Sequence, residues 1–188
     1  MDEKLDLRIK KTHKALLKAL QELLTEKSFD EISVTELCER AETRRATFYK
    51  HFGDKSELLV YMIQELQQEY NARNEVVFDI QNPKRCLTII FQYLIDFLDE
   101  NKVMARTVMK SNAKNIVLEI LSEQVTFDLQ NHFATFKQNK EVDKFLPEMM
   151  AVMSTGVVIS CAQWWITNSH RISKDDIIKQ FELLIEQS

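Results

Sequence analysis

Side chains that can hydrogen-bond to nucleic-acid bases gather in a short segment, residues 44–51. A helix over this segment buries Phe48 and leaves other faces to polar and basic residues, which are Arg44, Arg45, Thr47, Lys50 and His51. Arginine and lysine donate to guanine O6 and N7 in the major groove of DNA, and threonine contacts either base edge or the thymine methyl group. The segment therefore carries the side chains that base-specific DNA recognition needs.

The local charge supports this interpretation. Residues 44–55 contain four cations and one acid, a net charge of +3, within a chain whose net charge is −4. The alternative is that the charged face is simply solvated, which is the usual explanation of Lys and Arg at helical intervals. A basic island in an acidic chain instead favours a polyanionic partner.

Two short helices and a tight turn are predicted to position these side chains. The first helix has one buried face, because apolar residues recur at three- and four-residue steps at Val34, Leu37, Cys38 and Ala41. Phe48 and Phe52 repeat the step on the second segment. Only Glu42 and Thr43 separate the two segments, and Thr43 is the predicted N-cap of the second helix. This spacing is typical of a helix-turn-helix.

With these residues in view, the sequence ISVTELCERA followed by TRRATFYKHFGDKSELL resembles the DNA-binding domain of the tetracycline-repressor-like (TetR/AcrR) family of bacterial transcription regulators. The core TFYKHF-x-x-K is highly specific to that family. The resemblance is strong over about residues 8–70 and weak beyond, although Trp164-Trp165 also resembles one C-terminal branch of the family.

The resemblance implies roles for individual residues. The base-reading positions of the family correspond to Arg45, Thr47, Lys50 and Thr35, and Arg44 could contact either bases or phosphate. The phosphate-contacting positions correspond to Ser33, Tyr49, His51 and Lys55. Lys55 also opens the next helix, where free N–H groups and the helix dipole favour an anion.

Two departures from the family pattern concern the turn. The family usually has glycine where this chain has Glu42, and the left-handed conformation costs a non-glycine residue about 1 kcal/mol or more. Thr43 and Arg44 replace the usual apolar turn residue and the serine that follows it. We therefore expect the turn and the cap position to differ slightly from the family.

Composition predicts an all-α protein. The 188 residues include only two glycines and two prolines, 45% are hydrophobic, and no strand-like alternation is sustained. We expect an N-terminal three-helix helix-turn-helix domain at residues 1–54 and a larger C-terminal helical domain for ligand binding and dimerisation at residues 55–188. The three cysteines, Cys38, Cys86 and Cys161, are isolated in apolar stretches and are predicted to be buried thiols.

Local signals predict the helix boundaries. A first helix is expected from Leu7 to Glu26 and a fourth from about Asp54, and Asn82-Pro83 is a favourable start for a helix that ends near Glu100. The remaining helices are expected at a short segment through Met109, at Ala113–Lys137, at Pro147–Ser169, and after Ser173, where Asp176 makes a start like a capping box.

The helix predicted at Pro147–Ser169 is apolar on more than one face. One face suits the core of the subunit, and the other suits either a wide internal core or a contact with a second subunit. The family resemblance favours a homodimer. The candidate interface residues on this helix and the last one are Gly156, Val157, Ser160, Trp165, Phe181, Leu184 and Ile185.

In the family, the second domain often encloses a small apolar effector whose binding repositions the DNA readers. The residues that could line such a cavity are Phe91, Tyr93, Met104, Met109, Phe127 and Trp164. Methionine and aromatic residues at helical spacing can equally be plain core. The sequence leaves both interpretations open.

Other classes of function are disfavoured. We expect no enzyme activity, cofactor or metal site, because the chain has no glycine-rich phosphate loop, nucleophile elbow or HExxH, and its four histidines are scattered. No apolar run of 18 residues is recognised and the start of the chain mixes both charge signs, so a cytoplasmic protein without membrane insertion is expected. The predicted function is a repressor that binds a palindromic double-stranded DNA operator as a homodimer and is released by a small effector. The alternative is an accessory activator of the same fold whose second domain binds another protein.

Overall fold

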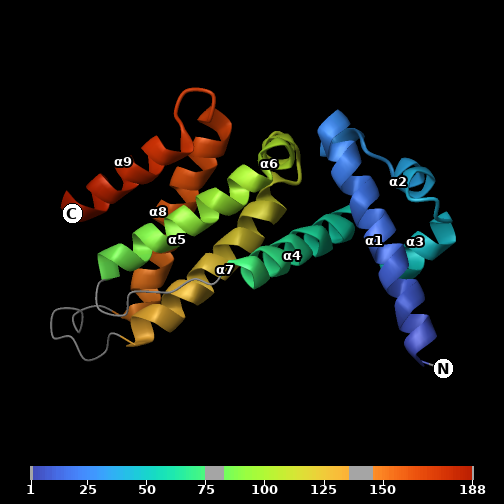
Figure 1. Ribbon diagram of the computed structural model, residues 1–188, viewed down its shortest axis with the longest axis horizontal. Helices are drawn as coiled ribbons and strands as arrows, with labels where there is room; N and C mark the ends of the chain where they lie inside the picture. Colours follow the sequence, from blue (N-terminus) through green and yellow to red (C-terminus); the bar gives the residue numbers. More distant parts are fainter. Residues whose placement is uncertain (1, 75–82, 136–145, 188) are drawn as a thin grey trace. The chain divides into compact units, whose positions relative to one another are not determined.

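The computed structural model describes residues 2–74, 83–135 and 146–187, and every regular element in these ranges is helical (Figure 1). The prediction of an all-α chain is confirmed. The elements are α1 (Asp2–Glu26), the 3-10 turn η1 (Phe29–Glu31), α2 (Val34–Arg40), α3 (Arg45–His51), α4 (Lys55–Arg73), α5 (Pro83–Glu100), α6 (Lys102–Met109), α7 (Lys114–Thr135), α8 (Pro147–Asn168) and α9 (Lys174–Gln187).

The chain divides into two compact units. Unit 1 comprises Met1–Glu69 and Val103–Val117, and unit 2 comprises Tyr70–Lys102 and Leu118–Ser188. Three helices cross the division: α4 after Glu69, α6 after its first residue Lys102, and α7 after Val117. The division therefore differs from the boundary expected after residue 54.

Unit 1 has its core where the apolar steps of the sequence predict it. Leu16, Leu20 and Leu23 of α1 are fully buried, as are Leu37 of α2 and Phe48 of α3. Burying side chains of this size contributes roughly 1.5–3 kcal/mol each. This burial therefore holds α3 in place, although helices as short as α2 and α3 would not be stable alone.

Unit 2 is built around α5, which packs against α8 and α9 (Figure 1). The rings of Phe91 and Phe181 stack with centroids 3.9 Å apart, and the Lys174 ammonium pairs with the Asp96 carboxylate at 2.8 Å. Between α7 and α8, the hydroxyl groups of Thr126 and Thr155 form a hydrogen bond of 2.9 Å. Polar and aromatic contacts thus join α5 to α9 and α7 to α8, and the packing of α5 against α8 connects the two pairs.

Most predicted helix boundaries agree with the structure to within a few residues. Pro83 begins α5, and Ser173 caps α9, since its hydroxyl oxygen accepts from the Asp176 N–H at 3.1 Å. The Ser173 hydroxyl also donates to the Asp176 carboxylate at 2.7 Å. The predicted cap Asn82 and the predicted helix end Lys137 lie outside the described residues.

Helix α8 is a longer apolar segment than the sequence analysis expects. Helix α8 is long and apolar enough to cross a membrane by length and composition alone, with a mean hydropathy of 1.4 over 18 residues. The core helix of a soluble protein passes the same test. In unit 2, α8 buries one face completely, with Val158, Trp165 and Ile166 at 0–1% exposure.

Candidate nucleic-acid interface

Helices α2 and α3 form the predicted helix-turn-helix. Ser33 caps α2, because its hydroxyl oxygen accepts from the Glu36 N–H at 3.2 Å. Leu37 and Cys38 of α2 and Phe48 of α3 are buried between the helices and the rest of unit 1. This packing fixes which side of α3 faces outward.

The turn between the helices is a Schellman motif with Glu42 in the left-handed conformation. Its φ is +50°, and among the described residues other than glycine no further residue has a positive φ. The Thr43 N–H donates to the Cys38 carbonyl at 2.8 Å, and the Glu42 N–H donates to the Glu39 carbonyl at 3.2 Å. Glu42 therefore takes the left-handed position of a Schellman motif, at a conformational cost of about 1 kcal/mol.

The predicted cap of α3 is wrong by one residue. Arg44, not Thr43, is the N-cap, and no side chain caps the helix. Thr43 is instead the second residue after Ala41, the C-cap of α2, and its N–H closes the Schellman motif. Arg44 has an extended backbone with φ −78° and ψ 142°, and the residue is exposed.

The side chains predicted to read bases lie together on unit 1. Arg44, Arg45 and Lys50 are exposed, Thr47 is half-buried beside them, and Thr35 is exposed near the start of α2. Within the described residues, no side-chain hydrogen bond or ion pair draws any of these five inward, whereas Arg40 on α2 donates to Glu26 at 2.8 Å. The outward surface of α3 therefore presents three cations and one hydroxyl group to a ligand.

Three of the predicted phosphate contacts lie on the edge of this surface. Tyr49 is exposed, with its ring 5.4 Å from the Phe48 ring. Ser33 is exposed, and its capping bond uses the oxygen as acceptor, which leaves the hydroxyl hydrogen as a donor. His51 is half-buried at the end of α3.

Lys55 does not face outward, and its predicted phosphate contact is corrected here. Its ammonium donates to the carbonyl oxygens of Phe29, Asp30 and Ile32 at 2.8, 3.1 and 2.7 Å. These bonds use all three donors of the group. Burial lowers the pKa of Lys55, and the nearby Asp30 and Asp54 act in the opposite direction. Lys55 is therefore a structural clamp on the segment between α1 and α2.

The start of α4 is also occupied by an anion of the chain itself. One carboxylate oxygen of Asp54 accepts from the N–H groups of Ser56 and Glu57 at 2.7 and 2.9 Å. This satisfies the helix terminus that the sequence assigned to phosphate. The basic island that remains exposed consists of Arg44, Arg45 and Lys50.

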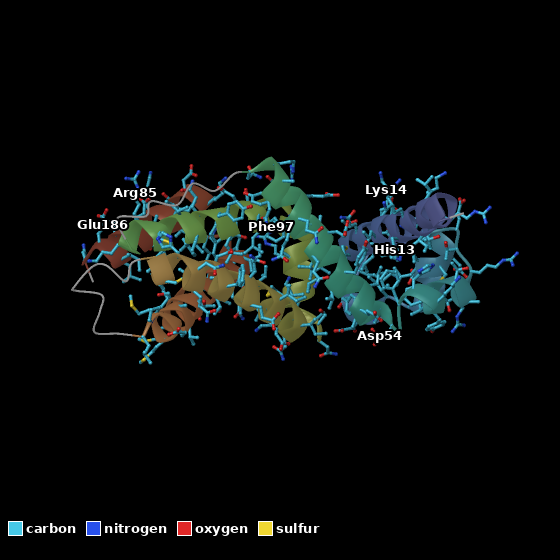
Figure 2. The ribbon with its side chains drawn as sticks, turned by 90° about the horizontal axis from the view of Figure 1, so that it is seen from below. His13, Lys14, Asp54, Arg85, Phe97 and Glu186 are labelled. Carbon is cyan, nitrogen blue, oxygen red and sulfur yellow. The ribbon has the colours of Figure 1, made fainter. Side chains whose placement is uncertain are left out.

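His51 is linked to the interior of unit 1 by an aromatic cluster. The His13 ring of α1 lies 5.0 Å from each of the rings of His51, Phe52 and Tyr61, and His13 extends from the α1 ribbon in Figure 2. Burial lowers the pKa of His13, His51 lowers it further, and Glu65 of α4 raises it. The cluster thus joins α1, α3 and α4 around one histidine.

The predicted dimer residues divide into two groups. Gly156, Val157, Ser160 and Leu184 are exposed, and Ile185 is half-buried. Trp165 and Phe181 are 0% and 3% exposed inside unit 2, so these two assignments to the interface are corrected. A side chain that the subunit core encloses has no surface left to touch a second subunit.

The exposed apolar surface of α8 forms one stripe. Its large members are Met149, Val152, Met153, Val157 and Trp164, which are between 42% and 63% exposed. The opposite face of α8 is buried and carries small residues, including Ala151, Thr155 and Ala162. Small residues allow neighbouring helices to approach closely, but Gly156 and Ser160 lie on the exposed face, so residue size in the sequence does not distinguish the inner face of α8 from the outer one. We call the exposed set the α8 stripe.

The predicted cavity residues do not surround one enclosed space. Phe91 is fully buried against Phe181, and the Tyr93 hydroxyl donates to Asn71 at 2.6 Å. Phe127 and Trp164 are 60% and 51% exposed, which excludes them from a closed cavity of this subunit. Met104 and Met109 are half-buried on α6 and belong to unit 1.

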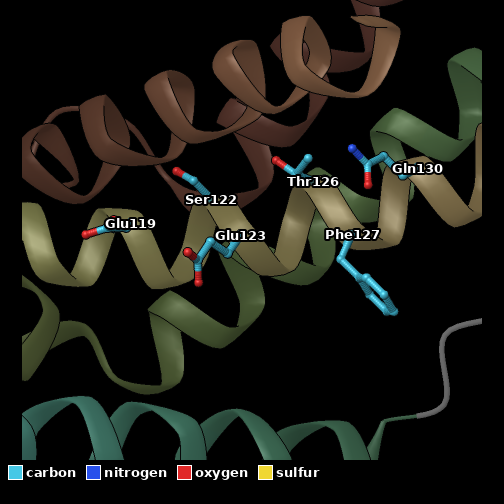
Figure 3. A pocket seen from close by; sticks show the side chains of 6 residues that line it. All are labelled: Glu119, Ser122, Glu123, Thr126, Phe127 and Gln130. Atoms are coloured by element: carbon cyan, nitrogen blue, oxygen red, sulfur yellow. The ribbon is translucent and has the colours of Figure 1, made fainter. Parts of the chain in front are cut away.

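A pocket of the described residues lies instead along the surface of α7 (Figure 3). It has a volume of about 410 Å³ and is lined by Glu119, Ser122, Glu123, Thr126, Phe127 and Gln130. Phe127 is the one predicted ligand residue in it. In the part of the chain that the structure describes, no group of three His, Cys, Asp or Glu side chains could hold a metal ion.

Comparison with known families covers both parts of the chain. Residues 16–62 match the family of bacterial regulatory proteins described as the tetR family. Residues 87–187, more than half of the chain, match the family described as a transcriptional regulator C-terminal region.

Individual relatives agree with this assignment. DhaS, the transcriptional activator of the dhaKLM operon in Lactococcus lactis, is 30% identical over 122 residues, which are 62% of this chain and 62% of DhaS. The transcriptional regulator YxbF of Bacillus subtilis is 32% identical over 101 residues, which are 50% of this chain and 26% of YxbF. The match therefore spans less than two thirds of either relative.

The fold is also found in solved structures. A TetR-family transcriptional regulator from Syntrophomonas wolfei superposes with a TM-score of 0.70 at 13% identity, and the match covers 94% of each chain. At that identity the likeness concerns the fold alone.

Proposed function

The chain belongs to the tetR family of bacterial regulatory proteins and is a helix-turn-helix transcription regulator, and from this premise we propose that it binds a palindromic DNA operator as a homodimer. We propose that it acts in the cytoplasm, where its operator DNA would be. In this proposal α3 enters the major groove, Arg45, Thr47 and Lys50 read bases, and Arg44 contacts a base or a phosphate.

One observation carries the proposal. The outward surface of α3 holds three exposed cations, Arg44, Arg45 and Lys50, in a chain whose net charge is −4. Solvation alone does not account for such a contrast, whereas a polyanionic ligand does. Thr35, Ser33, Tyr49 and His51 would extend the contact to neighbouring bases and phosphates.

The α8 stripe supports the dimer. A short recognition helix contacts few bases, and a two-fold dimer doubles the sequence that is read, with half-site centres about 34–36 Å apart. A large apolar surface that is exposed to water also commonly marks a contact with another protein. We propose that the contact between the two subunits is formed by the α8 stripe, which includes Val157, and by Gly156 and Ser160 beside it. Leu184 and Ile185 of α9 also lie in this contact.

The test is binding of the purified protein to DNA by fluorescence anisotropy over a series of salt concentrations. The duplexes are its own upstream promoter region and a scrambled sequence of the same composition. Tight binding to the promoter, with log K falling steeply as log salt rises, is expected. Equal and weak binding to both duplexes, together with failure to select any sequence from random DNA, would remove the proposal.

The sign of regulation has two candidates. We propose first a repressor that a small apolar effector releases, as the family habit suggests. The second candidate is an activator whose second unit binds another protein, and it is favoured by the similarity to the activator DhaS and by the open surface pocket on α7. Deleting the gene and measuring transcripts of adjacent genes separates them, because transcripts rise on loss of a repressor and fall on loss of an activator.

A further inference from the structure

We propose that Asp30 is a positioning residue that couples the start of α7 to the DNA-reading helices. This inference rests on the proposed DNA-binding function. Asp30 lies in η1, between α1 and α2, and both of its carboxylate oxygens accept from the main-chain N–H of Asn112 at 3.2 Å. The two residues are 82 positions apart in the sequence.

The DNA-reading side of this contact is held firmly. Lys55 binds the carbonyl oxygens of Phe29, Asp30 and Ile32, so the segment that carries the Asp30 carboxylate is fixed to the first residue of α4. Ile32 is followed directly by Ser33, the N-cap of α2. Only three peptide bonds separate Asp30 from Ser33, and Lys55 links the Asp30 and Ile32 carbonyl oxygens, so a displacement of Asp30 would reach the beginning of the helix-turn-helix.

The other side of the contact leads into α7. Asn112 precedes α7 by two residues, in a turn that the Ser111 hydroxyl organises by donating to the Val108 carbonyl at 2.8 Å and accepting from the Ala113 N–H at 3.2 Å. Ser111 is 8% exposed, so this turn is packed rather than free. Helix α7 then continues from unit 1 into unit 2, where its surface carries the pocket of Figure 3.

The Asp30 carboxylate joins these two segments by a charge-assisted bond. An anion also suits the beginning of a helix, because the helix dipole is positive there. A ligand or partner that shifts α7 would move the Asn112 N–H relative to Asp30. The DNA-reading helices would then lose or change their anchor.

Coupling of this kind is reciprocal, so it can be tested without knowing the effector. The probe is a duplex that the wild-type protein selects from a random-sequence library. The readout is amide hydrogen exchange over residues 110–117 in the full-length protein, with and without the duplex. Asp30→Ala removes the acceptor, and Asp30→Asn keeps its size with one acceptor oxygen. Glu39→Ala is the control, since Glu39 is an exposed acid of α2 whose side chain makes no hydrogen bond or ion pair among the described residues.

In the wild-type protein and in Glu39→Ala, the duplex should slow exchange at Asn112 by about tenfold, within the range usual for coupled sites. In Asp30→Ala the duplex should change that exchange less than about twofold while still binding, and Asp30→Asn should fall between. Asp30→Asn tests the same bond with less disturbance of the structure than Asp30→Ala. The conclusion therefore does not depend on an unchanged melting temperature of Asp30→Ala.

Two results would overturn the proposal. The first is a wild-type protein that binds the duplex with no change at Asn112, and the second is an Asp30→Ala protein that keeps the full wild-type change. A wild-type protein that selects no duplex at all would instead remove the DNA-binding function on which the coupling rests.

Discussion

The Lys55 ammonium donates to the carbonyl oxygen of Ile32 at 2.7 Å and so ties the first residue of α4 to the segment that precedes α2. Two further carbonyl oxygens, of Phe29 and Asp30, share the same ammonium, and the Phe29 ring lies 4.7 Å from it. A cation that is enclosed in this way stabilises the DNA-reading unit from inside.

Replacing Lys55 with Met should therefore act on stability. We expect the free energy of unfolding to fall by about 2 kcal/mol, because hydrogen bonds to a charged group are lost and carbonyl oxygens are left unpaired. Urea denaturation followed by circular dichroism measures this. The control Lys50→Met removes an exposed cation of α3 and should change stability by less than about 0.5 kcal/mol.

The same variant also tests the correction made to the role of Lys55. If the ammonium makes no phosphate contact, the salt slope of DNA binding should stay at its wild-type value in Lys55→Met. A slope that is flatter by about one unit would restore the phosphate contact that the sequence suggested.

Glu42 offers a second stability test. Its φ of +50° suits glycine, so Glu42→Gly should raise the free energy of unfolding by about 1 kcal/mol. The same substitution three residues earlier, Glu39→Gly, lies within α2 and should lower it by about 1 kcal/mol. A thermal melt of both variants gives the two signs, and a destabilised Glu42→Gly would mean that the turn is not strained.

The contrast between Lys55 and the local features shows what the sequence could predict. Some features depend only on residues within one or two helical turns of each other. These are the apolar spacing that buries Leu37 and Phe48, the start of α5 at Pro83, and the Ser173 cap of α9. Each was predicted and confirmed. The left-handed conformation of Glu42 follows from the family resemblance, since the family usually has glycine at that position.

Features that depend on distant partners were missed. The contacts of Lys55 lie 23 to 26 positions away, and the Asp30 contact lies 82 positions away, so no local pattern announces them. Trp165 and Phe181 were assigned to a dimer surface because large apolar residues at helical spacing look the same in a core and in an interface. Only the packing of α5 against α8 and α9 decides between the two.

Arg45 is the residue with which to test base recognition. Arg45→Ala should weaken binding to the selected operator by about 1–3 kcal/mol and relax the preference at one base pair. Anisotropy against a set of single-base-pair operator variants measures both effects. Arg40→Ala is the control, because Arg40 pairs with Glu26 and Glu22 on α1 and should not alter the preference at any base pair.

The α8 stripe predicts the effect of a charge at its centre. Val157 is 42% exposed, and Val157→Glu should convert the proposed dimer to a monomer at micromolar concentration, because burying an unpaired carboxylate is costly. Light scattering coupled to size exclusion measures the mass. Phe127→Glu places the same charge on α7 and should leave the dimer intact; if it alone disrupts the dimer, the interface lies on α7 instead.

His13 predicts how stability depends on pH. Burial holds its pKa below the ordinary value of about 6.5, the adjacent His51 lowers it further, and Glu65 raises it only in part. The unfolded chain therefore binds a proton at this residue before the folded chain does. By linkage, the contribution of this group to the free energy of unfolding should be constant above about pH 7, fall as the pH drops below about 6.5, and level off once the folded-state pKa is passed.

His13→Phe fills the same place among Phe52 and Tyr61 and should remove this part of the pH dependence, whereas a protein with the exposed His170 replaced, His170→Phe, should keep it. Urea denaturation at a series of pH values between 5 and 8 measures the slope for each protein, and an equal acid slope in His13→Phe and the wild-type protein would show that His13 is not the group responsible.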